Sequence, residues 1–335
     1  MNPHSQRPTR ILVVETLYLG DLIHTLPLLQ ALRAAYPEAR LDVLVRAPHV
    51  GLMAQVAGVD EVLAMDPRQH RGLGGIRALA RQLRAREYDW VINPGASDRA
   101  TLLTWLSGGR RRIGRLNRKQ SRWLWPRLHD EVVDQPWGSE PMYWQKLTAF
   151  QSLLQLSDRI DFGLDFSTVA LPDVSLPPRY VHVSPFASES IRCLPPATVV
   201  ELVAGLRQAL PEHGLVLSCG PSASETGRLR MLEPALRELG AVCLPGRLSL
   251  PQLGALIQRA SVHLGPDSGP LHCAVAVGTP AVGCFLFKHA SAEWMPVGAS
   301  HRSFGTTTRL DGGLYGLPVA DIVAAVATAA NRSRA

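Results

Sequence analysis

The sequence RILVVETLYLGDLIHTLPLLQALRAAYPEARLDVLVR (residues 10–46) contains a complete strand–helix–strand pattern. Short apolar runs at 10–15 and 41–46 predict two strands, and leucines recur at helical spacing between them, from Leu22 to Leu32. Alternating units of this kind form a parallel sheet that is covered by helices.

The same alternation continues along the chain in two series. The first series adds strands at 61–65 and 89–93. The second predicts strands at 180–184, 215–219, 241–244, 261–265 and 281–285, and helices at 197–210, 223–239, 250–259 and 271–277. The proline-rich segment LPDVSLPPR (171–179) separates the two series and predicts a linker.

We therefore predict an α/β protein with two Rossmann-like domains that face a central cleft. The first domain is expected to span residues 1–172 and the second residues 173–312. Residues 313–335 are expected to form a C-terminal helix that packs back towards the first domain. Ligands of open parallel sheets bind outside the carboxyl ends of the strands, so the site is expected there.

Composition narrows the class of protein. The 335 residues are 46% hydrophobic and 19% charged, without a visible secretory signal or an apolar run long enough to span a membrane. Five cysteines stand far apart and never as CxxC, which favours a reducing compartment over disulfides or structural zinc. The formal net charge of +7 suits an anionic partner: nucleic acid, a membrane surface or a phosphorylated substrate.

An acid and a histidine follow the first predicted strand, in GDLIHTLP. Pro27 fits a helix whose regular part begins near Thr25, which would leave Asp21 in a loop. Asp21 is either a helix-start acid or a site residue, and His24 either orients a ligand or packs.

The sequence GPDSGPLHCAVAVGTP (265–280) carries the strongest signal of a site. Asp267 or Ser268 can cap the following helix, and Gly269 lets the backbone approach a ligand closely. Free N–H groups at that helix start favour a phosphate. The alternative is a plain strand–turn–helix, although Asp267 and His272 framing a turn with two glycines is unusual for capping alone.

Two other loops follow predicted strands. In SPFASESIRCLPP (184–196), Ser188 and Arg192 could hold a diphosphate, or Arg192 could be a solvated surface residue. In CGPSASE (219–225), Glu225 could accept hydrogen bonds from ribose or simply favour the helix dipole.

The stretch RRRIGRLNRKQSRWLWPR (110–127) has eight basic residues, two tryptophans and no acid. It is either a solvated face or an anion-binding surface; no nucleic-acid module accompanies it. GLGGIR (72–77) lacks the third glycine of a dinucleotide fingerprint, and the histidines show no metal-ligand spacing.

Taken together, GDLIHTLP, SIRCLP and GPDSGPLHCAVAVGTP resemble the bacterial ADP-heptose:lipopolysaccharide heptosyltransferases of glycosyltransferase family 9. The resemblance covers nearly the whole chain and is greatest to the heptosyltransferase III subgroup. It implies a GT-B fold, with the acceptor bound by the first domain and the nucleotide sugar by the second. It also implies an inverting transfer that needs no metal and no cofactor.

The resemblance assigns roles to individual residues. Asp21 corresponds to the family's catalytic acid and is the expected general base. Arg192 is expected to neutralise the ADP leaving group, together with Ser188 and the helix start at Ser268–Gly269. The remaining donor-binding positions are Glu225 for ribose, Leu248 for adenine, and Asp267 and His272 for heptose and phosphates.

The expected acceptor is the anionic lipopolysaccharide inner core. The enzyme is expected to be cytoplasmic and to bind this acceptor at the inner face of the membrane. Acceptor-binding candidates are His24, Arg115, Arg118, Lys119 and Arg122, and nucleic acid is not an expected partner.

Three departures leave the donor sugar open: Arg192 replaces a lysine, Leu194 replaces an aromatic residue, and FLFKHAS (285–291) replaces a phenylalanine–glycine–proline turn. The alternatives are a related transferase with another nucleotide sugar or acceptor, and a non-catalytic nucleotide-sugar or glycolipid-binding protein.

Overall fold

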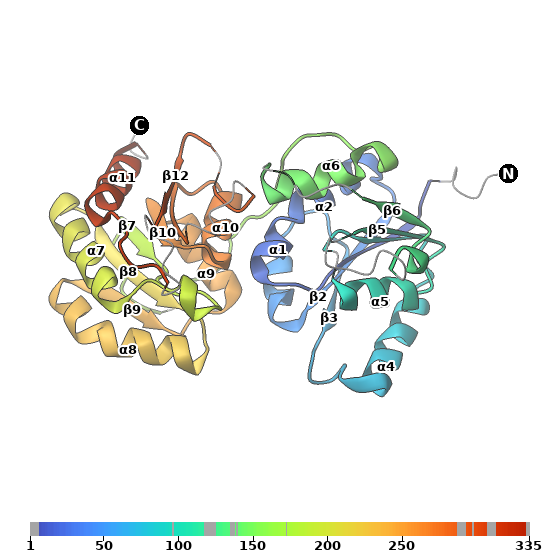
Figure 1. Cartoon of the computed structure of the whole chain (residues 1–335), viewed down its shortest axis with the longest axis horizontal. Helices are drawn as coiled ribbons and strands as arrows, with labels where there is room; N and C mark the ends of the chain where they lie inside the picture. Colours follow the sequence, from blue (N-terminus) through green and yellow to red (C-terminus); the bar gives the residue numbers. More distant parts are fainter. Residues whose placement is uncertain are drawn as a thin grey trace. The chain divides into compact units, whose positions relative to one another are not determined.

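The computed structural model describes residues 7–95, 97–116, 125–134, 138, 140–171, 173–286, 293–296, 298–306 and 313–332. The chain forms two compact units, Met1–Leu164 and Asp165–Ala335. Figure 1 shows a twisted sheet with helices on both faces in each unit.

The described part of the first unit contains a parallel sheet of six strands in the order β3-β2-β1-β4-β5-β6. The strands are β1 (Arg10–Glu15), β2 (Arg40–Arg46), β3 (Glu61–Met65), β4 (Trp90–Asn93), β5 (Arg111–Arg115) and β6 (Glu131–Val133). The helices are α1 (Leu19–Ile23), α2 (Leu26–Ala35), α3 (Val50–Met53), α4 (Gly72–Arg84), α5 (Asp98–Leu106) and α6 (Met142–Leu154).

The alternation of side chains along β1 divides the core of this unit into two layers. Leu12 and Val14 pack in one cluster with Leu79 and Leu83 of α4 and with residues of α5. The alternate side chains of β1 point to the other face, where α2 and α6 pack together (Figure 1). Glu15, the last residue of β1, is therefore directed under α2 and α6.

The described part of the second unit repeats this architecture, with the parallel order β12-β11-β10-β7-β8-β9. The strands are β7 (Tyr180–Val183), β8 (Gly214–Cys219), β9 (Ala241–Pro245), β10 (Val262–Pro266), β11 (Ala281–Phe285) and β12 (His301–Gly305). The helices are α7 (Pro196–Ala209), α8 (Ala223–Glu238), α9 (Leu250–Gln258), α10 (Gly269–Ala276) and α11 (Val319–Arg332).

Both sheets have the strand order of a Rossmann fold, since each reads 3-2-1-4-5-6 when numbered within its own unit. The predicted α/β class is thereby confirmed. None of the helices in the described residues is long and apolar enough to cross a bilayer.

The segment before β7 belongs to the second unit. The Phe166 amide donates to Gln258 Oε1 at 2.6 Å, and the Phe166 ring packs against Gly254. Further along, Leu171 and Leu176 pack on the core of the same unit. For these reasons the boundary lies between Leu164 and Asp165, before the predicted 172/173, and the proline-rich segment covers the second unit.

The C-terminal helix also differs from the sequence-based expectation. Its apolar residues Ile322, Val326 and Ala330 lie in the core of the second unit, and α11 packs against α7. This apolar face is therefore buried within the second unit, where we had expected a helix that packs towards the first.

Candidate active site

The predicted donor residues all follow carboxyl ends of strands in the second sheet. From the central pair β7 and β10 the strand order runs outwards in opposite directions, to β8 and β9 on one side and to β11 and β12 on the other. Ligands of open α/β sheets bind outside such a switch point. Ser188 and Arg192 follow β7, and Asp267 follows β10, so the switch point lies between them.

Arg192 and Asp267 form a direct contact across this point. Arg192 Nη1 donates to both the carbonyl and the Oδ2 of Asp267, each at 3.1 Å. His272 Nε2 lies 3.2 Å from the other carboxylate oxygen, Oδ1. Arg192 Nη2 also lies 3.5 Å from Glu189. The structure thus brings Arg192 to Asp267 and His272, which the sequence analysis had proposed from a different stretch.

The charges of this cluster favour an ionised Asp267. Burial alone would raise the pKa of Asp267, but the hydrogen bond and charge of His272, with those of Arg192, lower it below its ordinary value. The Asp267 carboxylate lies between His272 and Arg192 and holds the guanidinium in place. It does not occupy all five N–H donors of Arg192. Arg192 is thereby fixed beside the start of α10.

The start of α10 lacks the cap that the sequence suggested. Ser268 occupies the N-cap position, but its hydroxyl donates to the Pro266 carbonyl at 3.2 Å and makes no capping bond. Asp267 does not cap either, because its carboxylate is taken by Arg192 and His272. The first turn of an uncapped helix attracts anions through its N–H groups and dipole.

The other donor candidates follow neighbouring strands. Glu225, after β8, accepts from the Gly220 amide at 2.9 Å and from the Ser222 hydroxyl at 3.2 Å. These bonds give Glu225 the helix-start role considered as an alternative; its ribose role stays a prediction. Leu248, after β9, is half-buried against the core, and Ser188 is exposed in its loop.

In the first unit, Asp21 occupies the corresponding place after the central strand β1. It lies within the short helix α1, not in the expected loop, and α2 begins at Leu26 with Thr25 as its N-cap. Asp21 is half-buried. The chain thus leaves β1 through one short helical turn before the regular helix starts.

A buried ion pair that the sequence did not predict holds this turn in place. Lys146 Nζ on α6 lies 2.8 Å from Glu15 Oε2, and both side chains are buried to within 1%. The same ammonium donates to the Asp21 carbonyl at 2.7 Å and bonds to the Thr25 hydroxyl at 3.0 Å. The Thr25 hydroxyl lies 3.0 Å from Glu15 Oε2 and 2.9 Å from the Asp21 carbonyl, and its single proton can be donated to either oxygen.

Through Lys146, these hydrogen bonds connect the main chain of Asp21 to β1 and to α6. One sequence signal for this network existed: Glu15 is a charged residue that directly follows the apolar run ILVV (11–14). Its partner Lys146 lies 131 residues away in the sequence and has no local signal.

Two of the acceptor candidates are deeply buried. The His24 ring stacks on Tyr143 at a centroid distance of 5.9 Å and is 5% exposed. Arg115 ends β5, is fully buried and donates to Gln145 Oε1 at 3.1 Å. Both side chains thus contribute to packing under α6, and their acceptor roles stay predictions.

Several arginines of the basic stretch 110–127 have acidic partners that its composition did not indicate. Its own sequence has no acid, but Arg112 pairs with Asp130 at 2.6 Å and Arg110 pairs with Asp89 at 3.2 Å. Arg111 pairs with Glu131 and lies over the Trp90 ring. Arg110, Arg111 and Arg112 are therefore compensated by acids from elsewhere in the chain, and the anion-binding role of the stretch 110–127 stays a prediction. Arg118, Lys119 and Arg122 lie outside the described residues.

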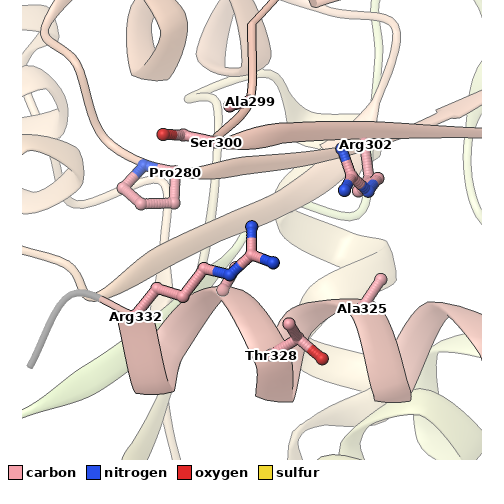
Figure 2. Close-up of a pocket in the computed structure, with 8 residues that line it drawn as sticks. Pro280, Ala299, Ser300, Arg302, Ala325, Thr328 and Arg332 are labelled. Atoms are coloured by element: carbon pink, nitrogen blue, oxygen red, sulfur yellow. The ribbon is translucent and has the colours of Figure 1, made fainter.

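One cavity of the second unit lies away from these residues. It has a volume of about 290 Å³ and lies between β12 and α11. Figure 2 shows Arg302 and Arg332 in its lining. Pro280 and Ser300, which also line it, precede β11 and β12, so the cavity lies at the amino ends of the strands. Within the described residues, no group of three or more potential metal ligands occurs.

Known proteins resemble the chain along most of its length. The family described as "Glycosyltransferase family 9 (heptosyltransferase)" matches residues 76–310. "Lipopolysaccharide heptosyltransferase 3" of Escherichia coli K12 is 25% identical over 281 residues, covering 80% of each chain.

Two solved structures share its fold. A family 9 glycosyl transferase from Veillonella parvula has a TM-score of 0.79 at 20% identity, covering 97% of this chain and 98% of that one. E. coli heptosyltransferase WaaC with ADP-2-deoxy-2-fluoro heptose has a TM-score of 0.72 at 22% identity, covering 92% and 95%.

The protein is thus a glycosyltransferase with a GT-B fold. The chain belongs to glycosyltransferase family 9, the heptosyltransferase family. The predicted family, fold and enzyme class are confirmed.

Proposed function

We propose that the enzyme transfers heptose from ADP-L-glycero-D-manno-heptose to the inner core of lipopolysaccharide. The observation that carries this proposal is the Arg192–Asp267–His272 cluster at the switch point of the second sheet, beside an uncapped helix start. A fixed guanidinium and the positive end of a helix dipole suit a diphosphate. A structural relative in complex with an ADP-heptose analogue supports this donor, and the relatives named for lipopolysaccharide support this acceptor.

The proposed reaction is a single inverting displacement. An acceptor hydroxyl oxygen attacks the anomeric carbon from the face opposite the diphosphate, and the bond from that carbon to the ADP oxygen breaks. ADP leaves with the electron pair, and Asp21 takes the hydroxyl proton as general base. Arg192 and the start of α10, with Ser188, stabilise the charge that develops on the leaving diphosphate without a metal ion.

Asp21 provides the test. Asp21→Ala should abolish turnover, because the attacking hydroxyl loses its base, while ADP affinity stays within about twofold of the wild type since Asp21 lies in the first unit. The matched control is Asp98→Ala, which removes an exposed acid from the start of α5 in the same unit. Turnover that survives Asp21→Ala would refute the role of base, and lack of turnover in the wild type would favour the non-catalytic alternative.

The donor is tested separately by thermal shift. A ligand that binds only the folded state raises the melting temperature by mass action. Among ADP-, UDP- and GDP-sugars, ADP-heptose should give the largest shift. A larger shift with another nucleotide sugar would overturn the proposed donor and support the related-transferase alternative.

We further propose that the enzyme works in the cytoplasm, at the inner surface of the membrane that holds its acceptor. The formal net charge of +7 supports attraction to an anionic lipid surface. Sedimentation with vesicles tests this placement.

A further inference from the structure

Helix α4 lies on the outside of the first unit (Figure 1). It carries a row of exposed arginines. Arg77, Arg81 and Arg84 are exposed and follow Leu73 at spacings of four, four and three, so all four side chains lie along one side of the helix. We name these four residues the arginine stripe. Leu73 is 75% exposed, among the largest exposures of an apolar side chain in the described residues.

The arginine stripe has no acidic partner. The sequence PRQHRGLGGIRALARQLRAR (67–86) contains no acid, and no described residue forms an ion pair with any stripe arginine. Other arginines of the same unit do have partners: Arg33 pairs with Asp60, and Arg86 pairs with Glu61. The positive charge of the stripe is therefore uncompensated, whereas these other arginines of the unit are paired.

The opposite side of α4 is fixed in the core. Leu79 and Leu83 pack against the sheet. The helix therefore cannot turn this apolar face towards another partner, and its outer side can act only through charge and through Leu73. Such a surface suits the headgroups of anionic lipids rather than insertion into hydrocarbon.

The position of α4 relates it to the acceptor. The helix begins shortly after the carboxyl end of β3, and the carboxyl ends of parallel strands share one edge of the sheet. Asp21 follows β1 at the same edge. Arg68 and Arg71, both exposed, lie between β3 and α4 and extend the basic surface towards that edge.

We propose that the arginine stripe is the surface by which the enzyme binds an anionic phospholipid bilayer. The proposal rests on the proposed function only in that the acceptor is held in such a bilayer. The charges of the headgroups complement the guanidinium groups, and the attraction decreases as salt screens it.

The test compares two triple variants with the same charge. Arg77→Glu/Arg81→Glu/Arg84→Glu removes the stripe, and Arg179→Glu/Arg230→Glu/Arg332→Glu changes three exposed arginines of the second unit. Each variant changes the charge by −6, from +7 to +1. The full chain is sedimented with phosphatidylglycerol vesicles and, separately, with phosphatidylcholine vesicles, and thermal melting confirms that each variant is folded.

The stripe variant should lose at least about tenfold in partitioning onto phosphatidylglycerol, and the control variant should lose much less. Wild-type binding should weaken from 50 to 500 mM salt, because the Debye length falls about threefold over that range. Equal losses in both variants would mean that net charge alone governs binding and would overturn the proposal. So would unchanged binding of the stripe variant.

Kinetics distinguish lipid binding from acceptor binding. With a delipidated, soluble core oligosaccharide as acceptor, the stripe variant should keep the wild-type kcat/KM, whereas with acceptor in vesicles its kcat/KM should fall. A comparable loss with the soluble acceptor would show that the arginines bind the sugar phosphates directly and would overturn the proposal. Vesicle sedimentation needs no turnover, so its result stands even if the proposed transfer reaction fails.

Discussion

Lys146 and Glu15 form a buried ion pair with 2.8 Å between Nζ and Oε2, and the same ammonium donates a hydrogen bond to the Asp21 carbonyl. One cation thus joins the end of the central strand to the main chain of the proposed base. We therefore expect Lys146 to position Asp21, so that its substitution should change the pH profile of turnover as well as stability.

Breaking this pair should destabilise the first unit. Lys146→Met leaves the Glu15 carboxylate buried and unpaired, which should cost about 3–5 kcal/mol in the free energy of unfolding. The double variant Glu15→Gln/Lys146→Met removes both charges and should recover part of that loss. Urea denaturation of the wild type, both single variants and the double variant measures the coupling; additive losses would contradict it.

The pH dependence of turnover should shift in opposite directions in the two single variants. Lys146→Met leaves a negative charge near Asp21 and disfavours ionisation of the base, so the acidic limb of kcat/KM should move to higher pH. Glu15→Gln leaves a positive charge and should move that limb to lower pH. The measurement is the pH profile of kcat/KM with saturating donor. Shifts in the same direction would indicate a purely structural role.

Arg192 should contribute to turnover through the leaving diphosphate. Arg192→Met is expected to lower kcat by about 10²–10³, the usual effect of removing one preorganised donor from a developing charge. Arg192→Lys keeps the charge and should lose less. Arg259→Met, which removes an arginine bonded to the Ser167 carbonyl in the same unit, is the control for folding. Steady-state kinetics that show no difference between Met and Lys would rule out a charge role.

Acid should destabilise the second unit through two buried histidines. His182 Nδ1 lies 2.9 Å from His263 Nδ1, and its Nε2 lies 2.8 Å from the Ser218 hydroxyl. Burial lowers the pKa of His182 to about 3, and burial with the charge of His182 lowers the pKa of His263 well below 6.5. Below pH 6.5 the unfolded chain therefore binds protons that the folded unit excludes.

The contribution of these histidines to the free energy of unfolding is fully present above about pH 6.5. It is lost as the pH falls towards 3, by up to about 1.4 kcal/mol per pH unit for each histidine. His263→Gln removes one of the two titrating groups, so the free energy of unfolding should depend less steeply on pH, by up to about 1.4 kcal/mol per pH unit. Chemical denaturation between pH 7 and pH 5 measures it, and an unchanged slope in the variant would contradict the assignment.

The sequence predicted elements with a clear apolar pattern and missed several without one, including a strand whose arginines pair with acids. Strands β1 and β3 match their predicted ranges because each is a short apolar run. Strand β5, RRIGR, was missed because its arginines resemble a solvated surface until Asp130 and Glu131 of the neighbouring chain segment pair with them.

The candidate site shows the same division. Arg192, Asp267 and His272 were found because each lies shortly after a predicted strand, and the parallel sheet then brings the carboxyl ends of those strands together. Lys146 lies in a helix far along the sequence from Glu15, and only the tertiary fold relates the two. Local pattern identifies loops at the ends of strands, but it does not identify partners from distant helices.

The attachment of both the 165–171 segment and α11 to the second unit matters for anyone who exchanges halves between family members. A hybrid enzyme with a foreign donor half should take residues 165–332 as one piece, because a graft of 173–312 would leave Phe166 behind and expose the core positions that Ile322 and Val326 fill. Such a graft would be expected to aggregate before its sugar preference could be measured.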